Sequence, residues 1–390
     1  MVEWKKLGEI CYISDYVSNG SFASLRDNVQ YKSEPDYAIL VRFAYYSNGF
    51  DTSKFVYIDE HAYHFLSKSY LEGGEIIMSN VGSCGLLFRC PKLDRKMSLA
   101  PNSILIKSEF IDYLYYWLGG NVGQEEIRKI TSKSAMPKFN KTEFKKIQVP
   151  IPSIEEQNRI VGILDTFTAS IENLKEQITQ RRKQYEHYRD QLLDLEGKEG
   201  VEIKTLGTIC HIGDGLHGTP EYDENGDYFF INGNNLSNGH IILKSDTKRV
   251  NEEMFAKYGI ELNTTSILMS INGTIGNIAF YHNERIVLGK SAAYFQVRKK
   301  DILDYKYLYF YLQTQKANDY YQSMLTGSTI KNLGLKALRT FEIPIPSLPE
   351  QSRIVSILDT FEASIANLEA QLSQREKQYE YYRNKLLTFE

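Results

Sequence analysis

The chain has 390 residues, of which 42% are hydrophobic and 24% are charged, and its formal net charge is -3. This length allows two or three domains with packed cores, and the charge balance excludes a uniformly basic coat for nucleic acid, although not local basic patches. The cysteines form no Cys-x-x-Cys pair, no apolar run approaches ~20 residues, and residues 1–9 lack a signal sequence. We therefore expect a soluble cytoplasmic protein.

The strongest pattern along the chain is an internal repeat. Residues 149–174 read VPIPSIEEQNRIVGILDTFTASIENL, and residues 343–368 read IPIPSLPEQSRIVSILDTFEASIANL. About two-thirds of the paired positions are identical, far more than two unrelated helices share. Weaker matches precede each copy and pair 2–13 with 201–212, 76–85 with 267–276, and 112–118 with 306–312. The sequence therefore predicts two variable domains, each followed by a shared segment.

The variable domains are predicted to mix short strands with helices. Apolar and aromatic runs bounded by turn residues predict strands at 37–46, 75–80, 102–107, 228–235, 266–271 and 292–299. Residues 112–118 and 306–324 are predicted to be helical. The expected fold class is α+β (mixed), with a strand order that the sequence leaves open.

The shared segments are predicted to form long coiled-coil helices. Their apolar positions recur in alternating steps of four and three, which is the heptad seam of a left-handed supercoil. Ser153 is a candidate N-cap, with Glu156 in the capping-box position. The seam comprises Leu164, Phe167, Ile171, Leu174, Ile178 and Arg181 in the first copy, and Leu358, Phe361, Ile365, Leu368, Leu372 and Arg375 in the second.

One arginine interrupts each apolar seam, Arg181 in the first copy and Arg375 in the second. A charged core position costs stability but fixes register. In one interpretation the side chain reaches from the seam to its solvated edge. In the other, the guanidinium makes an ion pair across the helices or with a partner.

Motifs that resemble cofactor or catalytic sites lack their structural context. The G-x-G-x-x-G at 213–218 is followed by turn residues instead of the helix that a dinucleotide fold requires, so we interpret it as a loop near a ligand. The Gly-Lys-Ser at 289–291 lacks the glycine that a phosphate loop places five residues earlier. The histidines do not cluster with cysteine or carboxylate at metal-ligand spacing. These motifs therefore give no positive evidence of catalysis.

The charge is distributed unevenly along the chain. Residues 153–196 carry a net charge of -3 and residues 347–390 carry -2, which leaves +2 on the remainder. Residues 128–146 hold seven basic side chains against one acidic side chain, interleaved with Ser and Asn. Such a stretch suits phosphate oxygens and base edges, although a solvated basic face is the simpler explanation of one stretch alone. The corresponding stretch of the second half, residues 326–339, is also basic.

The arrangement resembles the specificity (S) subunit of type I restriction–modification enzymes. The residues that carry the resemblance are L-G-x-I at 7–10 and 206–209, P-I-P-S at 150–153 and 344–347, and E-Q-x-R-I-V at 156–161 and 350–355. Residues 218–235 also look like the opening of one type of recognition domain. The resemblance covers the whole chain. It implies target-recognition domains at 1–152 and 197–346, with conserved spacer helices at 153–196 and 347–390.

The resemblance further implies what the chain does. The two helices would lie antiparallel as a coiled coil, with the recognition domains related by a pseudo-twofold axis. Each domain would read one half of a split site in double-stranded DNA. Two modification subunits would dock on the chain and methylate adenine, and restriction subunits would complete the complex. S-adenosylmethionine, ATP and Mg would be bound by those partners, with no cofactor and no metal on this chain, no catalytic residues and no membrane partner.

Candidate DNA-binding residues lie in loops that flank the shared strands. Loop Asn, Ser, Thr, Lys and Arg side chains read base edges and phosphates. They are Asn19, Ser21, Arg42, Asn80, Ser83, Lys133, Lys138 and Asn140 in the first half, and His217, Thr219, Asn232, Asn234, Asn272, Thr274, Lys331 and Asn332 in the second. Simple solvation explains any single one of them equally well. Gly82 and Gly273 are interpreted as turn residues.

Two other classes of function stay open at this point. A fused restriction–methylation enzyme would need a cofactor-binding catalytic domain. A coiled-coil scaffold that binds only protein would need no selective contact with DNA. Binding of duplex DNA together with the modification subunits separates these possibilities.

Overall fold

The structure is a computed structural model that describes residues 2–327 and 330–389. The chain forms two compact units, one made of residues 1–174 and 371–390 and the other of residues 175–370. We call them unit 1 and unit 2. The long helices α8 (Ile154–Leu193) and α14 (Leu348–Leu387) each contribute to both units.

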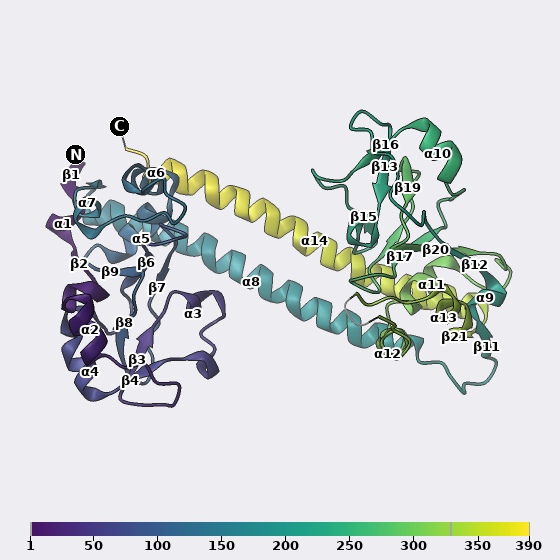
Figure 1. Ribbon diagram of the computed structural model, residues 1–390, viewed down its shortest axis with the longest axis horizontal. Coiled ribbons are helices and arrows are strands. Elements are labelled where there is room, and N and C mark those ends of the chain that lie inside the picture. The colour runs from purple at the N-terminus through teal and green to yellow at the C-terminus, as the bar shows by residue number, and fades with distance from the viewer. Residues whose placement is uncertain (1, 328–329, 390) are drawn as a thin grey trace. The chain divides into compact units, whose positions relative to one another are not determined.

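Unit 1 contains two four-stranded sheets (Figure 1). The first has the order β2-β9-β6-β7 with every pair antiparallel, and the second has the order β4-β3-β8-β5, in which β3 and β8 are parallel. A short antiparallel pair, β1-β10, joins the start of the chain to the strand before α8. The strands are β1 (Glu3–Lys6), β2 (Tyr12–Asp15), β3 (Ala38–Val41), β4 (Tyr57–Ile58), β5 (Tyr70–Leu71), β6 (Ile76–Ser79), β7 (Leu87–Arg89), β8 (Lys96–Leu99), β9 (Ser103–Lys107) and β10 (Gln148–Ile151).

Short helices cover these sheets. They are α1 (Leu7–Ile10), α2 (Phe22–Asn28), α3 (Ala44–Ser47), α4 (Glu60–Phe65), α5 (Ile111–Gly119), α6 (Asn121–Ile130) and α7 (Lys141–Phe144). The predicted strand at 37–46 is only partly right, because Ala38–Val41 is a strand while Ala44–Ser47 is helical. Residues 75–80 and 102–107 do contain the predicted strands. Every side chain of β6 is buried, which accounts for the apolar run at residues 76–78.

Unit 2 repeats this plan with different loops. Its four-stranded antiparallel sheet has the order β12-β20-β17-β18, and its second sheet has the order β16-β13-β19, in which β13 and β19 are parallel. The pairs β11-β21 and β14-β15 complete the unit. The strands are β11 (Glu202–Thr205), β12 (Cys210–Asp214), β13 (Tyr228–Ile231), β14 (Leu236–Ser237), β15 (His240–Ile241), β16 (Arg249–Val250), β17 (Ile267–Ser270), β18 (Ile278–Phe280), β19 (Ile286–Leu288), β20 (Ala292–Val297) and β21 (Glu342–Ile345).

The helices of unit 2 correct one prediction. They are α9 (Leu206–Ile209), α10 (Glu252–Tyr258), α11 (Tyr305–Tyr311), α12 (Gln315–Ser323) and α13 (Leu335–Thr340), besides parts of α8 and α14. The predicted helix at 306–324 is two helices, because Thr314 begins a new one by accepting the N–H of Ala317 with its hydroxyl. The aromatic residues of α11 from Tyr307 to Tyr311 are buried in the core, which also contains Phe295 and Leu358.

An identical hydrogen bond holds the segment before each long helix. The buried hydroxyl of Tyr113 donates to the carbonyl of Pro150 at 2.9 Å, and that of Tyr307 donates to the carbonyl of Pro344 at 2.9 Å. Both tyrosines lie on the repeated aromatic helix, α5 in unit 1 and α11 in unit 2. This helix therefore fixes the strand that leads into each long helix.

The two long helices are antiparallel within each unit. In unit 1 the ring of Phe167 stacks on Tyr382 with a centroid distance of 5.4 Å, and in unit 2 the ring of Phe361 stacks on Tyr188 at 5.5 Å. Residue numbers thus rise along one helix as they fall along the other. The residues of the predicted seam are buried or half-buried in both helices. Ser153 caps α8 by accepting the N–H of Glu156.

The seam arginines lie over aromatic rings. The guanidinium of Arg181 is 5.9 Å from the ring centroid of Phe361 in unit 2, and that of Arg375 is 5.6 Å from the ring centroid of Phe167 in unit 1. A guanidinium is attracted to the negative face of an aromatic ring. Each half-buried arginine therefore contributes to the seam through this cation–π contact.

A half-buried carboxyl lies where α14 packs in unit 2. Glu362 accepts hydrogen bonds from the hydroxyls of Tyr185 at 3.1 Å and Tyr309 at 3.4 Å. Burial is the main cause that raises the pKa of the Glu362 carboxyl above its ordinary value, and the nearby charge of Asp359 adds to it. The folded unit therefore holds a proton on this carboxyl more tightly than the unfolded chain does.

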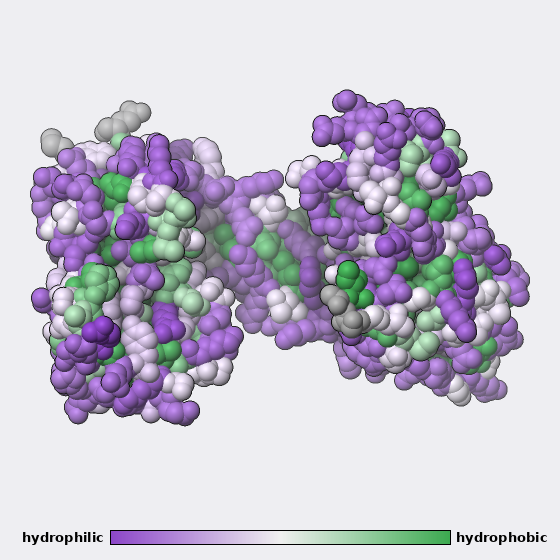
Figure 2. All heavy atoms as spheres, in the orientation of Figure 1, coloured by the Kyte–Doolittle hydropathy of each residue, from purple (hydrophilic) through white to green (hydrophobic). Residues whose placement is uncertain are grey.

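On the face drawn in Figure 2, each unit is predominantly hydrophilic, with smaller apolar patches. In the part of the chain that the structure describes, no helix is both long enough and apolar enough to span a membrane.

Candidate nucleic-acid interface

In unit 1, two loops that are far apart in the sequence are joined by hydrogen bonds, and the second of them leads directly into α7. The N–H of Gly82 donates to the carbonyl of Pro137 at 2.8 Å, and the N–H of Phe139 donates to the carbonyl of Asn80 at 3.2 Å. The first loop follows β6 and the second follows α6. We call residues 80–86 and 132–140 together the two-loop site of unit 1.

Unit 2 builds the same site with the same backbone bonds. The N–H of Gly273 donates to the carbonyl of Lys331 at 3.0 Å, and the N–H of Leu333 donates to the carbonyl of Ile271 at 2.9 Å. The two-loop site of unit 2 comprises residues 271–277, 326–327 and 330–334. The repeat thus conserves a main-chain frame while the side chains on it differ.

A glycine is required at one position of each frame. Gly82 has a φ of 77° and Gly273 has a φ of 73°, the left-handed region in which a Cβ is strained. Apart from each glycine's chain neighbours, no atom of the described residues lies within 4 Å of the place where a Cβ would be. The prediction that these glycines serve a turn is confirmed, and the turn aims the N–H at the second loop.

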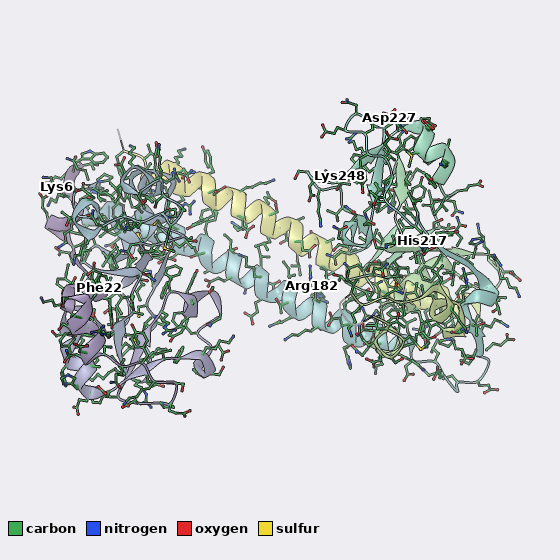
Figure 3. All side chains as sticks on the ribbon, in the orientation of Figure 1. Lys6, Phe22, Arg182, His217, Asp227 and Lys248 are labelled. Carbon is green, nitrogen blue, oxygen red and sulfur yellow. The ribbon has the colours of Figure 1, made fainter. Side chains whose placement is uncertain are left out.

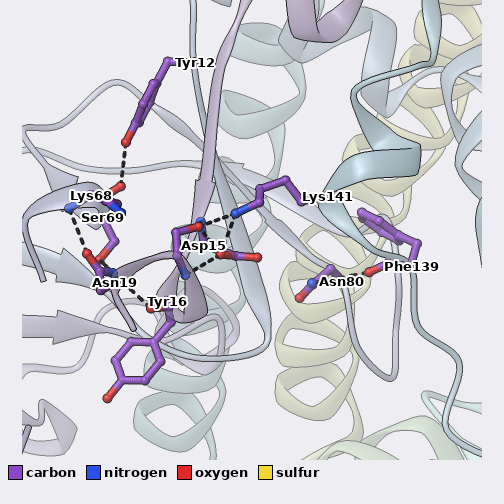
Figure 4. Close-up of polar contacts among 10 residues, drawn as sticks. Tyr12, Asp15, Tyr16, Asn19, Lys68, Ser69, Asn80, Phe139 and Lys141 are labelled. Carbon is purple, nitrogen blue, oxygen red and sulfur yellow. Dashed lines mark hydrogen bonds and ion pairs between the residues drawn. The ribbon is translucent and has the colours of Figure 1, made fainter. Parts of the chain in front are cut away.

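The two-loop site of unit 1 brings together most of the candidates from the first half. Asn80, Ser83, Lys133, Lys138 and Asn140 all lie on it, and Ser83, Lys133, Lys138 and Asn140 are exposed. The Nδ2 of Asn80 is 3.5 Å from the carbonyl of Phe139, while its Oδ1 is buried without a hydrogen-bond partner in the structure (Figure 4). The Oδ1 of Asn140 accepts the N–H of Glu143 at 2.8 Å, so Asn140 also caps α7.

Three candidates from the first half lie elsewhere. The side chain of Asn19 donates to the carbonyl of Tyr16 and to the hydroxyl of Ser69, both at 2.9 Å, and accepts the N–H of Lys68 at 2.8 Å (Figure 4). These three hydrogen bonds give the Asn19 side chain a structural role within unit 1. Ser21 caps α2, and the guanidinium of Arg42 lies 5.4 Å from the ring centroid of Tyr31. The structure therefore gives each of these side chains a local role.

An ion pair that the sequence did not reveal attaches the end of β2 to the start of α7. The Nζ of Lys141 is 3.0 Å from the Oδ1 of Asp15 and also contacts the hydroxyl of Ser18 (Figure 4). Only 27% of the lysine side chain and 13% of the aspartate side chain are exposed. A partly buried pair of this kind fixes the segment after β2 beside the second loop.

In unit 2 the two-loop site borders a cavity of about 710 Å³. Four candidates from the second half line it, and they come from four different segments of the chain. They are His217, Asn232, Asn272 and Asn332. Thr219, Asn234, Thr274 and Lys331 are exposed on the same loops but do not line the cavity. The cavity therefore has a polar wall of amide and imidazole groups, which can donate and accept hydrogen bonds at base edges.

Hydrogen bonds hold these cavity side chains in place. The Nε2 of His217, which is labelled in Figure 3, is 2.7 Å from the Oδ2 of Asp214. The Oδ1 of Asn232 accepts from the hydroxyl of Ser291 at 2.8 Å, and the Nδ2 of Asn272 donates to the carbonyl of Lys290 at 3.3 Å. Asp214, Lys290 and Ser291 also line the cavity, and sequence reasoning did not select them.

The repeat carried a signal that identifies the missed acidic residues. Asp15 ends β2 and Asp214 ends β12, at corresponding positions of the two units. Each faces a basic partner, Lys141 in unit 1 and His217 in unit 2. Aligning the two halves beyond residues 13 and 212 would have paired the two carboxylates. The G-x-G-x-x-G segment, interpreted as a loop near a ligand, supplies His217 to the cavity wall.

No group of three or more His, Cys, Asp or Glu side chains within residues 2–327 and 330–389 is placed to hold a metal ion. The four cysteines are free. Burial raises the pKa of the Cys210 thiol to about 12.

Comparison with known proteins identifies the family. A family model described as the type I restriction modification DNA specificity domain matches residues 1–181 and 198–376. The chain is 33% identical over 300 residues to the specificity subunit of the type I restriction enzyme EcoR124I/EcoR124II from Escherichia coli, an alignment covering 72% of this chain and 71% of that one. It is 31% identical over 268 residues to a putative type I restriction enzyme specificity subunit from Haemophilus influenzae, covering 65% and 66% of the two chains.

Solved structures show the same fold. The S subunit of a type I restriction–modification system from M. genitalium matches with a TM-score of 0.56 and 15% identity, over 100% of this chain and 97% of that chain. A chain from a structural study of complex assembly and conformational transition of the type I R-M system matches with a TM-score of 0.63 and 17% identity, over 99% and 97%. The predicted mixed fold with repeated recognition domains and paired long helices is confirmed. The chain belongs to the type I restriction–modification specificity subunits, whose role is DNA sequence recognition within a complex.

Proposed function

We propose that this chain reads a bipartite site in double-stranded DNA, with one half read by each unit, and holds two modification subunits without catalysis of its own. The observation that carries the proposal is the duplicated main-chain frame of the two-loop sites. Corresponding glycines and carbonyls make the same hydrogen bonds in both units, while the side chains on the frame differ. A repeated scaffold with different polar side chains suits two different half-sites.

The charges near these sites support contact with a nucleic acid. The basic residues between 128 and 146 surround the second loop in unit 1, and Lys290 and Lys331 belong to the corresponding region in unit 2. Lysines placed beside amide side chains allow phosphate contacts to position the amides against base edges. The segments 153–196 and 347–390 together carry a net charge of -5, against +2 on the remainder, and they are the part of the chain most repeated between its halves. Two copies of one partner could therefore bind, because each half of the chain presents a similar helix surface.

The proposal assigns cofactors to the partners. S-adenosylmethionine would be bound by the modification subunits, and ATP and Mg by the restriction subunits where these are present. This chain would contribute selectivity and assembly.

Methylome sequencing of a host that carries this chain with its modification subunits tests the proposal. We expect methylated adenine within one two-part motif. Exchanging residues 1–152 for those of a related specificity subunit should change one half of the motif and leave the other half intact. Gel shifts of the same complex on random duplexes provide the control. Binding without sequence preference would instead support the protein-only scaffold.

A further inference from the structure

The second loop of each two-loop site contains a five-residue turn with an exposed apolar side chain at its fourth position. In unit 1 the N–H of Ser132 donates to the carbonyl of Lys138 at 2.9 Å, and in unit 2 the N–H of Thr326 donates to the carbonyl of Asn332 at 3.0 Å. These hydrogen bonds close turns that comprise residues 133–137 in unit 1 and 327–331 in unit 2. Residues 328–329 lie outside the described residues. Met136 and Ile330 hold the fourth positions, and each is 67% exposed.

We propose that Met136 and Ile330 are specificity-determining residues, each of which lies against the bases of one half-site. The inference rests on the proposed function, because it requires that each unit reads DNA. It adds an apolar contact to the polar side chains already assigned. The chemistry is that of an aliphatic group against a thymine methyl or between two stacked bases, both of which proteins use in reading DNA.

Repetition distinguishes these residues from ordinary exposed apolar side chains. Single apolar residues are common on protein surfaces and need no explanation. Leu86, in the first loop of unit 1, is one such residue, and its counterpart in unit 2 is the polar Asn277. At the turn position, by contrast, the amino acid changes from Met to Ile, yet the apolar character and the exposure are the same in both units.

A backbone hydrogen bond fixes the residue that follows each of these two apolar side chains. The residue after Met136 is Pro137, whose carbonyl is fixed by Gly82, and the residue after Ile330 is Lys331, whose carbonyl is fixed by Gly273. A side chain on a turn anchored on its C-terminal side loses less conformational entropy on binding than one on a free loop. Each side chain is therefore preorganised through the fixed residue on its C-terminal side, Pro137 in unit 1 and Lys331 in unit 2.

The charges around the turns select nucleic acid as the occupant. Residues 132–138 contain two lysines, and residues 326–332 contain one, and neither segment contains an acidic residue. In unit 2, Ile330 also borders the cavity whose wall carries Lys290 and the amides of Asn272 and Asn332. In such a surface the apolar side chain can contact a base, while the neighbouring lysines contact the phosphates that flank it. An apolar protein surface would leave those lysines without partners.

The experiment uses the complex of this chain with its modification subunits and duplexes that carry the motif found by methylome sequencing. Met136→Ala should raise the Kd for the cognate duplex roughly tenfold and lower discrimination only in the half-site read by unit 1. Ile330→Ala should do the same only in the other half-site, so each variant controls for the other. Met136→Leu and Ile330→Val should retain most of the affinity. Leu243→Ala, which removes a 44% exposed apolar side chain outside the two-loop sites, should change neither half.

Salt dependence separates the apolar contact from a phosphate contact. Met136→Ala should leave the slope of log Kd against log salt unchanged, because no counterion is released by an apolar group. Lys133→Ala should reduce that slope.

Two arms distinguish the possible base contacts. Replacing a thymine with uracil should reproduce the loss caused by the alanine variant if the contact is with the methyl group. If the side chain enters a base step, 2-aminopurine at that step should be bright with the unchanged chain and quenched with the variant.

The inference is overturned if the unchanged complex binds its motif selectively while both alanine variants bind it equally well. It is also overturned if either variant co-purifies with less modification subunit, since the turn would then contact protein. Failure of the proposed function looks different, because the unchanged complex would itself show no sequence preference.

Discussion

The guanidinium of Arg375 lies 5.6 Å from the ring centroid of Phe167, across the two long helices of unit 1. Arg181 and Phe361 make the corresponding contact in unit 2. The seam therefore retains its arginines because they face aromatic rings on the opposite helix, and their aliphatic parts pack along the seam.

Truncating this arginine tests that explanation. Arg375→Ala should lower the free energy of unfolding by about 1 kcal/mol, because it removes both the cation–π contact and the packed aliphatic chain. Arg375→Lys should recover part of the loss. Denaturant unfolding of the purified chain measures both, and Arg181→Ala should behave like Arg375→Ala. An increase in stability would show that the charge is a net cost at this position.

The buried tyrosine hydroxyls that bond to proline carbonyls make a second prediction. Tyr113→Phe and Tyr307→Phe should each destabilise the chain by about 1–2 kcal/mol, since a buried carbonyl at Pro150 or Pro344 would lose its donor. Thermal unfolding measures the loss. Tyr381→Phe, at a 60% exposed position, is the matched control and should be close to neutral. Equal effects at all three positions would contradict the assignment.

The Asp15–Lys141 pair should couple energetically. A double-mutant cycle with Asp15→Asn and Lys141→Met should give an interaction of about 1–2 kcal/mol, because both groups are largely buried and face each other. Lys146→Met provides a control, as its partner Glu143 is exposed and the pair is screened by solvent. Cognate binding should weaken in one half-site only, measured with duplexes altered in one half at a time. A coupling near zero would mean that the pair does not hold the loop.

The Glu362 carboxyl predicts a specific pH dependence. Its pKa is raised by burial, so the folded chain binds this proton more tightly than the unfolded chain. The stability that the group contributes is therefore complete below its ordinary pKa of 4.5 and falls as the pH rises through the interval above that value. Glu362→Gln removes this fall. The melting temperature of the variant relative to the unchanged chain should be higher at pH 8 than at pH 4, and an equal difference at both would refute the assignment.

The location of the chain's ends predicts tolerance of circular permutation. Leu7 and Leu387 belong to the same buried core of unit 1, and residues 197–200 form an exposed connection in unit 2. A permutant that opens between Gly197 and Gly200 and joins the old ends by a flexible linker should fold and support methylation. A permutant opened inside α8, after Lys175, should fail because it interrupts the helix. Gel filtration with the modification subunits and a methylation assay measure the outcome, and loss of folding in the first permutant would contradict it.

Local patterns predicted the long helices well and the two-loop sites poorly. The heptad spacing predicted the buried face of both helices, because helix periodicity appears within a few turns. The hydrogen bond between Gly82 and Pro137 joins residues more than fifty positions apart, and no local propensity encodes such a pairing. Asn19 shows a related limit. Its residue type suits a base contact, but two of its three hydrogen bonds join it to Ser69 and Lys68, which lie far from it in the sequence.

The two-loop sites are held together through the main chain at Gly82 and Gly273, and the bonds there do not depend on which side chains the turns carry. A substitution at the fourth turn position therefore leaves the scaffold without a broken contact to repair. If each unit reads one half-site, as we propose, a single residue change in one unit can alter one half of the target and leave the other half unchanged. Gly82 and Gly273 cannot vary in this way, because a side chain at either position would redirect the N–H that aligns the two loops.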